Sequence, residues 1–63
     1  MTFSIFYVVN GNIDVLRDTN GNMSIFQDFN LAFNTAKQLA RNNSNVIISI
    51  VENESGSIIV DFQ

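Results

Sequence analysis

Apolar and β-branched residues gather in short runs along the chain, and turn residues separate the runs. The first run, Phe3–Val9, is rich in aromatic and β-branched residues, which favours a strand. Asn10-Gly11 follows, and this pair is typical of a two-residue hairpin because a type I′ turn needs positive φ at both central residues. We therefore predict a second strand over Asn12–Asp18. A two-residue turn would place Tyr7 opposite Asp14.

The same turn signal occurs again at Asn20-Gly21. A third strand over Asn22–Gln27 would then complete an antiparallel meander. If this turn also contains two residues, Arg17 faces Ser24.

In the middle of the chain the apolar period changes to three and four residues, which indicates one face of a helix. Asn30 is the expected N-cap and Asp28 the alternative, because either side chain can accept hydrogen bonds from the first-turn amides. A run of Asn and Ser over residues 42–45 is expected to end the helix, since Asn tolerates the left-handed conformation. The apolar positions are Phe29, Ala32, Phe33, Ala36, Leu39 and Ala40.

Two more β-branched runs follow, Val46–Glu52 and Ser57–Phe62, and the connection between them contains Gly56, which suits a hairpin loop. The predicted order is β-β-β-α-β-β within a single domain of residues 1–63. We expect an α+β fold, with a mainly antiparallel sheet and one helix packed on one face. The order of the strands within the sheet does not follow from the sequence.

The predicted strands lack the clean alternation of apolar and polar residues that an antiparallel sheet with one wet face shows. Both Phe3–Val9 and Val46–Glu52 carry apolar residues on both faces, whereas a single helix covers only one. Two explanations compete. The second face is covered by a terminus or by curling of the sheet, or it packs on another copy of the chain or on another protein. A small chain that lacks disulfides and metal ligands favours the second explanation.

The composition removes several classes of function. The 63 residues include no Cys and no His, so disulfides are excluded and a zinc site lacks its usual ligands. Only three cationic side chains are present and the net charge is −3, which argues against binding to nucleic acid or to an anionic membrane. With no cationic leader and no long apolar run, we expect a cytoplasmic protein.

No group of residues forms a catalytic motif. Without His or Cys, a Ser or Thr nucleophile lacks its usual activating base, and we expect no enzymatic activity, no cofactor and no bound metal. The segment Asp18–Asn22 matches four of the first five positions of a calcium loop. The sixth position is then Met23 instead of Gly, and the twelfth is Phe29 instead of Glu. An Asn-Gly hairpin turn is the better interpretation.

We therefore expect a homodimeric, non-catalytic protein-binding module whose partners are a second copy of the chain, another protein, or both. The alternatives are binding of nucleic acid or nucleotide through the open sheet face, and a structural role in a larger assembly. Candidate interface residues are apolar or aromatic anchors, together with acidic residues that would steer the chain to a basic surface. They are Phe6, Tyr7, Val8, Asp14, Asp18, Ile47, Val51, Glu52, Glu54 and Ile59.

About half of the chain follows one pattern: a strand that ends in Phe, a helix with Ala at every fourth residue, and a hairpin closed by Gly. In this pattern it resembles a group of very small bacterial and phage β-β-α-β-β proteins of unknown function, from which it differs in its extra N-terminal strand and few charges. In size and organisation it is also similar to small phage-encoded inhibitors of host proteins. The resemblance implies an accessory protein of a phage or mobile element that acts in the host cytoplasm. The matching residues are Phe26, Ala32, Ala36, Ala40, Arg41, Val46, Ile48, Gly56 and Ile58.

Overall fold

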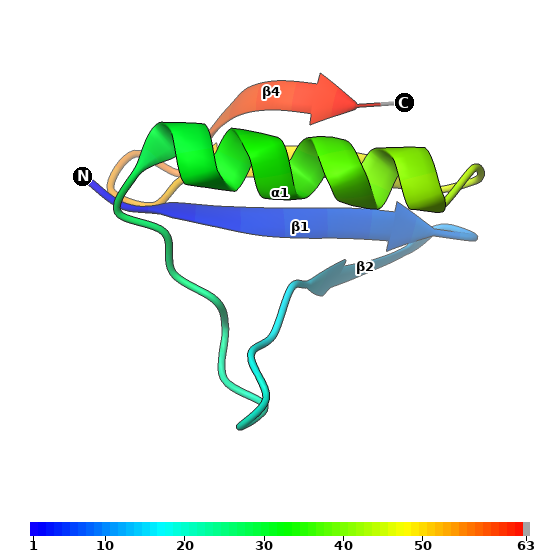
Figure 1. The fold of residues 1–63 in the computed structure, drawn as a ribbon, viewed down its shortest axis with the longest axis horizontal. Helices are drawn as coiled ribbons and strands as arrows, with labels where there is room; N and C mark the ends of the chain where they lie inside the picture. Colours follow the sequence, from blue (N-terminus) through cyan, green and yellow to red (C-terminus); the bar gives the residue numbers. More distant parts are fainter. Residues whose placement is uncertain (63) are drawn as a thin grey trace.

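The computed structural model describes residues 1–62, which form a four-stranded antiparallel sheet with one helix packed on it (Figure 1). The strands lie in the order β2-β1-β3-β4, so β1 and β3 are central. This arrangement confirms the α+β class, with one strand fewer than predicted. The elements in chain order are β1 (Phe3–Val9), β2 (Asn12–Val15), α1 (Phe29–Asn42), β3 (Ile47–Glu52) and β4 (Ser57–Phe62).

The first hairpin forms as its turn signal predicts. Asn10 and Gly11 both have positive φ, 52° and 82°, as a type I′ turn requires. The resulting register places Tyr7 opposite Asp14, which confirms the predicted pairing. Strand β2 is shorter than predicted, because it ends at Val15 instead of Asp18.

The predicted third strand over Asn22–Gln27 is wrong. At Asn20-Gly21 only Gly21 has positive φ, 84°, so the type I′ turn does not form. Asp18 instead accepts hydrogen bonds from the amides of Asn20 and Asn22, at 2.9 and 3.0 Å, and folds the chain into a local loop. This loop projects away from the sheet (Figure 1).

Two short contacts with the sheet hold the segment between β2 and α1 in place. Leu16 donates its amide to the carbonyl of Ile5 at 2.8 Å, and Phe26 exchanges two backbone hydrogen bonds with Phe3. These bonds occupy the edge of β1 beyond the end of β2. Within the projecting loop Arg17 pairs with Met23, so the predicted pairing with Ser24 is also wrong.

The core lies between α1 and the sheet face that α1 covers. Ala32 and Ala36 are fully buried on α1, and their small side chains allow close approach to the fully buried Ile5 and Ile50. A row of aromatic rings extends this contact across the sheet, with centroid distances of 5.3 to 5.9 Å between neighbours. The row runs through Phe3, Phe29, Phe33 and Phe62.

The two ends of α1 are capped by side chains. Asp28, the alternative that the sequence offers, is the N-cap in place of Asn30, and it accepts the Asn30 amide at 2.9 Å. The helix ends at Asn42 within the predicted Asn-rich run. The next residue, Asn43, is extended instead of left-handed, and its side-chain amide donates to the Leu39 carbonyl at 2.8 Å.

A one-methylene deletion tests this core. Replacing Ile50 by Val should lower the free energy of unfolding by about 0.5–1.5 kcal/mol, because the residue is fully buried and the vacated space cannot refill completely. Ile59→Val is the matched control, since Ile59 is 46% exposed and the same change there should cost less than about 0.5 kcal/mol. Urea unfolding followed by far-ultraviolet circular dichroism measures both. Equal losses at the two positions would contradict the assignment of Ile50 to the core.

Candidate functional site

The sheet has an inner face, which α1 covers, and an outer face on the opposite side. Directly paired residues on neighbouring strands share a face, and successive residues along a strand alternate between faces. Ile5, opposite Ile50, and Tyr7, opposite Ile48, lie on the inner face. The residues between them therefore lie on the outer face.

The outer face is apolar across all four strands. Its large exposed residues are Ile13 on β2, Ile47 on β3, and Ile58 and Ile59 on β4, with exposed fractions of 72%, 40%, 62% and 46%. These are half of the eight exposed large hydrophobic residues in the described part of the chain. Between these exposed positions lie the half-buried side chains of Phe6, Val8 and Val51.

A β-bulge in β4 increases the apolar area of this face. Ile50 pairs with Val60, but the next residue of β3, Val51, pairs with Ile58, so β4 has one extra residue at this point. Ile58 shares the face of Val51, and Ile59 shares the face of Asp61 by strand alternation. The bulge thus places two consecutive isoleucines on the outer face.

The end of the outer face near the start of β1 is closed. Ser4 is fully buried there, and its hydroxyl lies 2.8 Å from Asn53 Oδ1 and 3.6 Å from Met23 Sδ. Asn53 also donates its side-chain amide to Thr2 Oγ1 at 3.1 Å. The projecting loop and the chain terminus therefore cover one end of the face, as one of the two explanations expects, and the rest stays open.

The open part forms a shallow groove of about 350 Å³, here called the outer groove. Ile13 and Ile58 form its two rims on the edge strands, and the central strands form its floor. The lining residues are Phe6, Val8, Ile13, Ser49, Val51, Gly56 and Ile58.

The apolar interface candidates fall on both faces of the sheet. Five of them lie together on the outer face, and Tyr7 lies apart from them on the inner face. Ile13 and Ile58, the two rims, are not among the candidates that the sequence indicates, because the length of β2 and the position of the bulge decide their exposure. The five outer-face candidates are Phe6, Val8, Ile47, Val51 and Ile59.

Glu52 and Asp18 act within the chain. Glu52 is only 8% exposed, and its carboxylate accepts the amides of Glu54 and Ser55 at 2.9 and 3.0 Å and the Ser55 hydroxyl at 2.8 Å. The hydrogen bond from the Glu54 amide, followed by those from Ser55, lowers the pKa of Glu52. Glu52 therefore caps the β3–β4 loop as Asp18 caps its own loop.

The other two acidic candidates lie near cationic groups. Asp14 accepts the Val15 amide at 2.8 Å and lies 3.5 Å from Arg17; the Val15 hydrogen bond is the main cause that lowers the pKa of Asp14. Glu54 lies 3.3 Å from the amino group of Met1, with both groups largely exposed. Neither residue lines the outer groove.

The charge on the outer face comes from Asp61, which accepts a hydrogen bond from Ser49 on the neighbouring strand. Lys37 and Arg41 are exposed on α1, on the other side of the sheet. Arg17 lies in the projecting loop and pairs with Asp14. Within residues 1–62 the outer face therefore carries an acidic group and no cation.

Neither a metal-binding cluster nor a helix able to cross a membrane occurs in the part of the chain that the structure describes. The chain matches no protein-family model, no curated protein and no solved structure.

The hydrogen bonds at Glu52 predict a pH dependence of stability. Because the folded pKa lies below the ordinary value of 4.5, Glu52 stabilises the fold above that value, and this contribution is lost as the pH falls through the folded pKa. Glu52→Gln should flatten the fall in urea midpoint below pH 4.5 that the unsubstituted chain shows. Asp14 contributes to the pH dependence of stability in the same direction in both proteins. The difference between their two pH profiles therefore reports on Glu52 alone. Parallel profiles would show that the loop hydrogen bonds have no net effect.

Proposed function

We propose that the chain is a non-catalytic protein-binding module that binds an amphipathic helix of a partner protein in its outer groove. The observation that supports this proposal is the apolar surface on the face opposite α1, which extends over all four strands and is lined in the outer groove by uncharged residues. Contiguous apolar patches on small proteins mark interaction surfaces.

The size of the sheet suits a helix. Its outermost strands are about 14 Å apart at a strand spacing of ~4.8 Å, and a helix with its side chains is about 10–12 Å wide. The inner face already holds a helix of 14 residues, α1, on β1, β3 and β4. A partner helix of similar length on the outer face would complete three layers, with helices on both sides of the sheet.

Charge favours a basic partner over a second copy of this chain. The outer face carries Asp61, and the chain as a whole has a net charge of −3. Two copies would bring like charges together, whereas Lys or Arg beside the apolar ridge of a partner helix would be attracted. The homodimer predicted from the small size of the chain stays a prediction, as does the inhibition of a host protein that the resemblance implies.

Binding of nucleic acid through the same face finds little support. Phosphate binding depends on cationic side chains, and the described outer-face residues include none. The outer groove instead offers Phe6 and aliphatic side chains, which suit the apolar side of a helix.

A displayed library of random 20-residue peptides tests the proposal. Selection on the unsubstituted protein should enrich peptides with apolar residues at i, i+3, i+4 and i+7 and with flanking Lys or Arg. These peptides should bind the double variant Ile13→Thr/Ile58→Thr about 10- to 100-fold more weakly, because the apolar rims are removed while β propensity is kept. Leu31→Gln is the matched control: Leu31 is 56% exposed on α1, and its replacement should leave binding unchanged.

Three outcomes would contradict the proposal. The first is a lack of enrichment. The second is enrichment of alternating, strand-like peptides, which would point to the free edge of β4. The third is a stable dimer by light scattering that dissociates in Ile13→Thr/Ile58→Thr but not in Leu31→Gln, because a second copy would then occupy the groove.

A further inference from the structure

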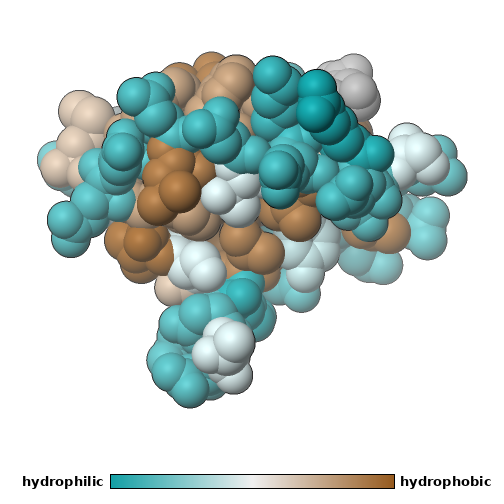
Figure 2. Space-filling model, in the orientation of Figure 1, coloured by the Kyte–Doolittle hydropathy of each residue, from teal (hydrophilic) through white to brown (hydrophobic). Residues whose placement is uncertain are grey.

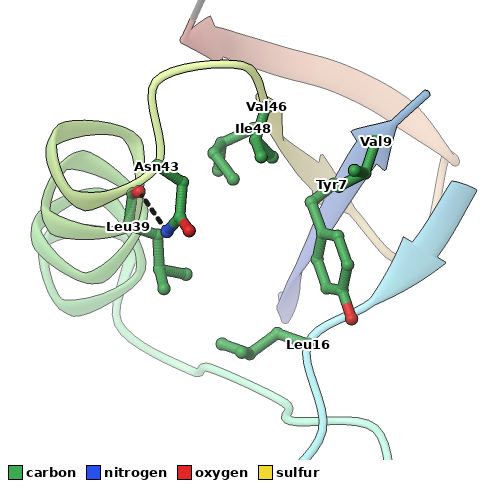
Figure 3. A pocket seen from close by; sticks show the side chains of 7 residues that line it. All are labelled: Tyr7, Val9, Leu16, Leu39, Asn43, Val46 and Ile48. Carbon is green, nitrogen blue, oxygen red and sulfur yellow. Dashed lines mark hydrogen bonds between the residues drawn. The ribbon is translucent and has the colours of Figure 1, made fainter. Parts of the chain in front are cut away.

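A second pocket lies on the inner side of the sheet, at the end of α1 away from the aromatic row. It has a volume of about 260 Å³ and is here called the Tyr7 pocket (Figure 3). Tyr7 and Val9 from β1 form one side, and Leu39 and Asn43 from the end of α1 form the other. The full lining is Tyr7, Val9, Leu16, Leu39, Asn43, Val46 and Ile48.

The pocket exists because α1 does not fill this end of the inner face. Among the described residues α1 packs on β3, β1 and β4 but not on β2. Phe29 and Phe33 fill the space under the first half of α1, whereas the second half offers the smaller Leu39 and Ala40. A band of apolar residues reaches the surface along the lower margin of α1, above the projecting loop (Figure 2).

The walls define the shape and polarity of a ligand. A cavity of about 150 Å³ lined by aliphatic side chains holds one benzene ring, so the Tyr7 pocket has room for two fused rings. The Tyr7 ring forms a wall opposite Leu39 (Figure 3). The Tyr7 hydroxyl donates a hydrogen bond to Asp14 Oδ2 at 3.4 Å. The ring face is thus available for stacking on a flat aromatic group.

One side-chain acceptor accompanies these apolar walls. The amide nitrogen of Asn43 donates to the Leu39 carbonyl at 2.8 Å, and this bond fixes the orientation of the side chain. The amide oxygen of Asn43 lies on the side that faces Tyr7 (Figure 3). A ligand with a single N–H donor would satisfy this oxygen within an otherwise apolar site.

From this geometry we infer that the Tyr7 pocket binds a small, neutral, bicyclic aromatic molecule with one N–H donor, of the indole class. The site is separate from the outer groove, since the two lie on opposite faces of the sheet and share no lining residue. The inference therefore goes beyond the proposed helix binding and does not depend on it.

Titration of the ¹⁵N-labelled protein with indole tests the inference. We expect saturable shifts at the amides of Leu16, Leu39 and Asn43, with a dissociation constant of about 0.1–1 mM for a ligand of this size. Binding of 1-methylindole, which lacks the donor, should be about 2- to 10-fold weaker, because one hydrogen bond is lost. Intermolecular nuclear Overhauser effects between indole and the Tyr7 ring give a second readout, since Tyr7 is the only Tyr in the chain.

Adjacent residues of β1 provide a matched pair of variants. Val9→Phe places a ring in the Tyr7 pocket without changing a core residue and should abolish indole binding. Val8→Phe makes the same change in the outer groove. It should leave indole binding unchanged and weaken the binding of the helical peptides. The two sites are thus tested separately.

Absence of saturation by indole on the unsubstituted protein would overturn the inference, whatever the fold of the variants. If Val9→Phe and the unsubstituted protein bound indole with equal affinity, the location of the site would be wrong. Equal affinities for indole and 1-methylindole would overturn the role of the Asn43 oxygen.

Discussion

The packing of α1 on the inner face of the sheet is the contact on which the rest of the structure depends. Ala32 and Ala36 bring the helix close to Ile5 and Ile50, and all four side chains are fully buried. This contact forms the buried core of the described residues, and the chain of 63 residues lacks the Cys and His with which small domains are often stabilised. Because the described residues 1–62 form only one helix, the chain covers one face of its sheet and leaves most of the other face to solvent.

Both candidate sites follow from this limited cover. The outer groove lies on the face that α1 does not reach, and the bulge that places Ile58 and Ile59 side by side increases its apolar area. The Tyr7 pocket lies on the covered face, where α1 extends beyond its aromatic contacts and leaves β2 without a helix above it. A partner that packs on the outer groove would give the central strands the two-sided burial that their composition suits.

Local signals in the sequence predicted most of the elements, whereas longer-range relations were not predictable. The Asn10-Gly11 turn and the apolar face of α1 depend on neighbouring residues, and both form as expected. The prediction of a third strand was wrong because Asp18 accepts hydrogen bonds from the amides of Asn20 and Asn22. These bonds form a local loop, which competes with a hairpin. Glu52 looked like a free surface charge, yet its partners lie two and three residues further along the chain. The rims of the outer groove depend on strand order and on a bulge, neither of which leaves a sequence signal as strong as Asn-Gly.

The central claim is that the outer face of the free protein is open and apolar. Paramagnetic relaxation of isoleucine methyl signals by a neutral, soluble gadolinium chelate tests it most directly, because the effect falls steeply with distance from solvent. Strong broadening is expected for Ile13, Ile58 and Ile59, and weak broadening for Ile5 and Ile50. If the outer-face methyl groups were protected to the same extent as the core pair, another part of the chain or a second copy would already cover that face, and the claim would be wrong.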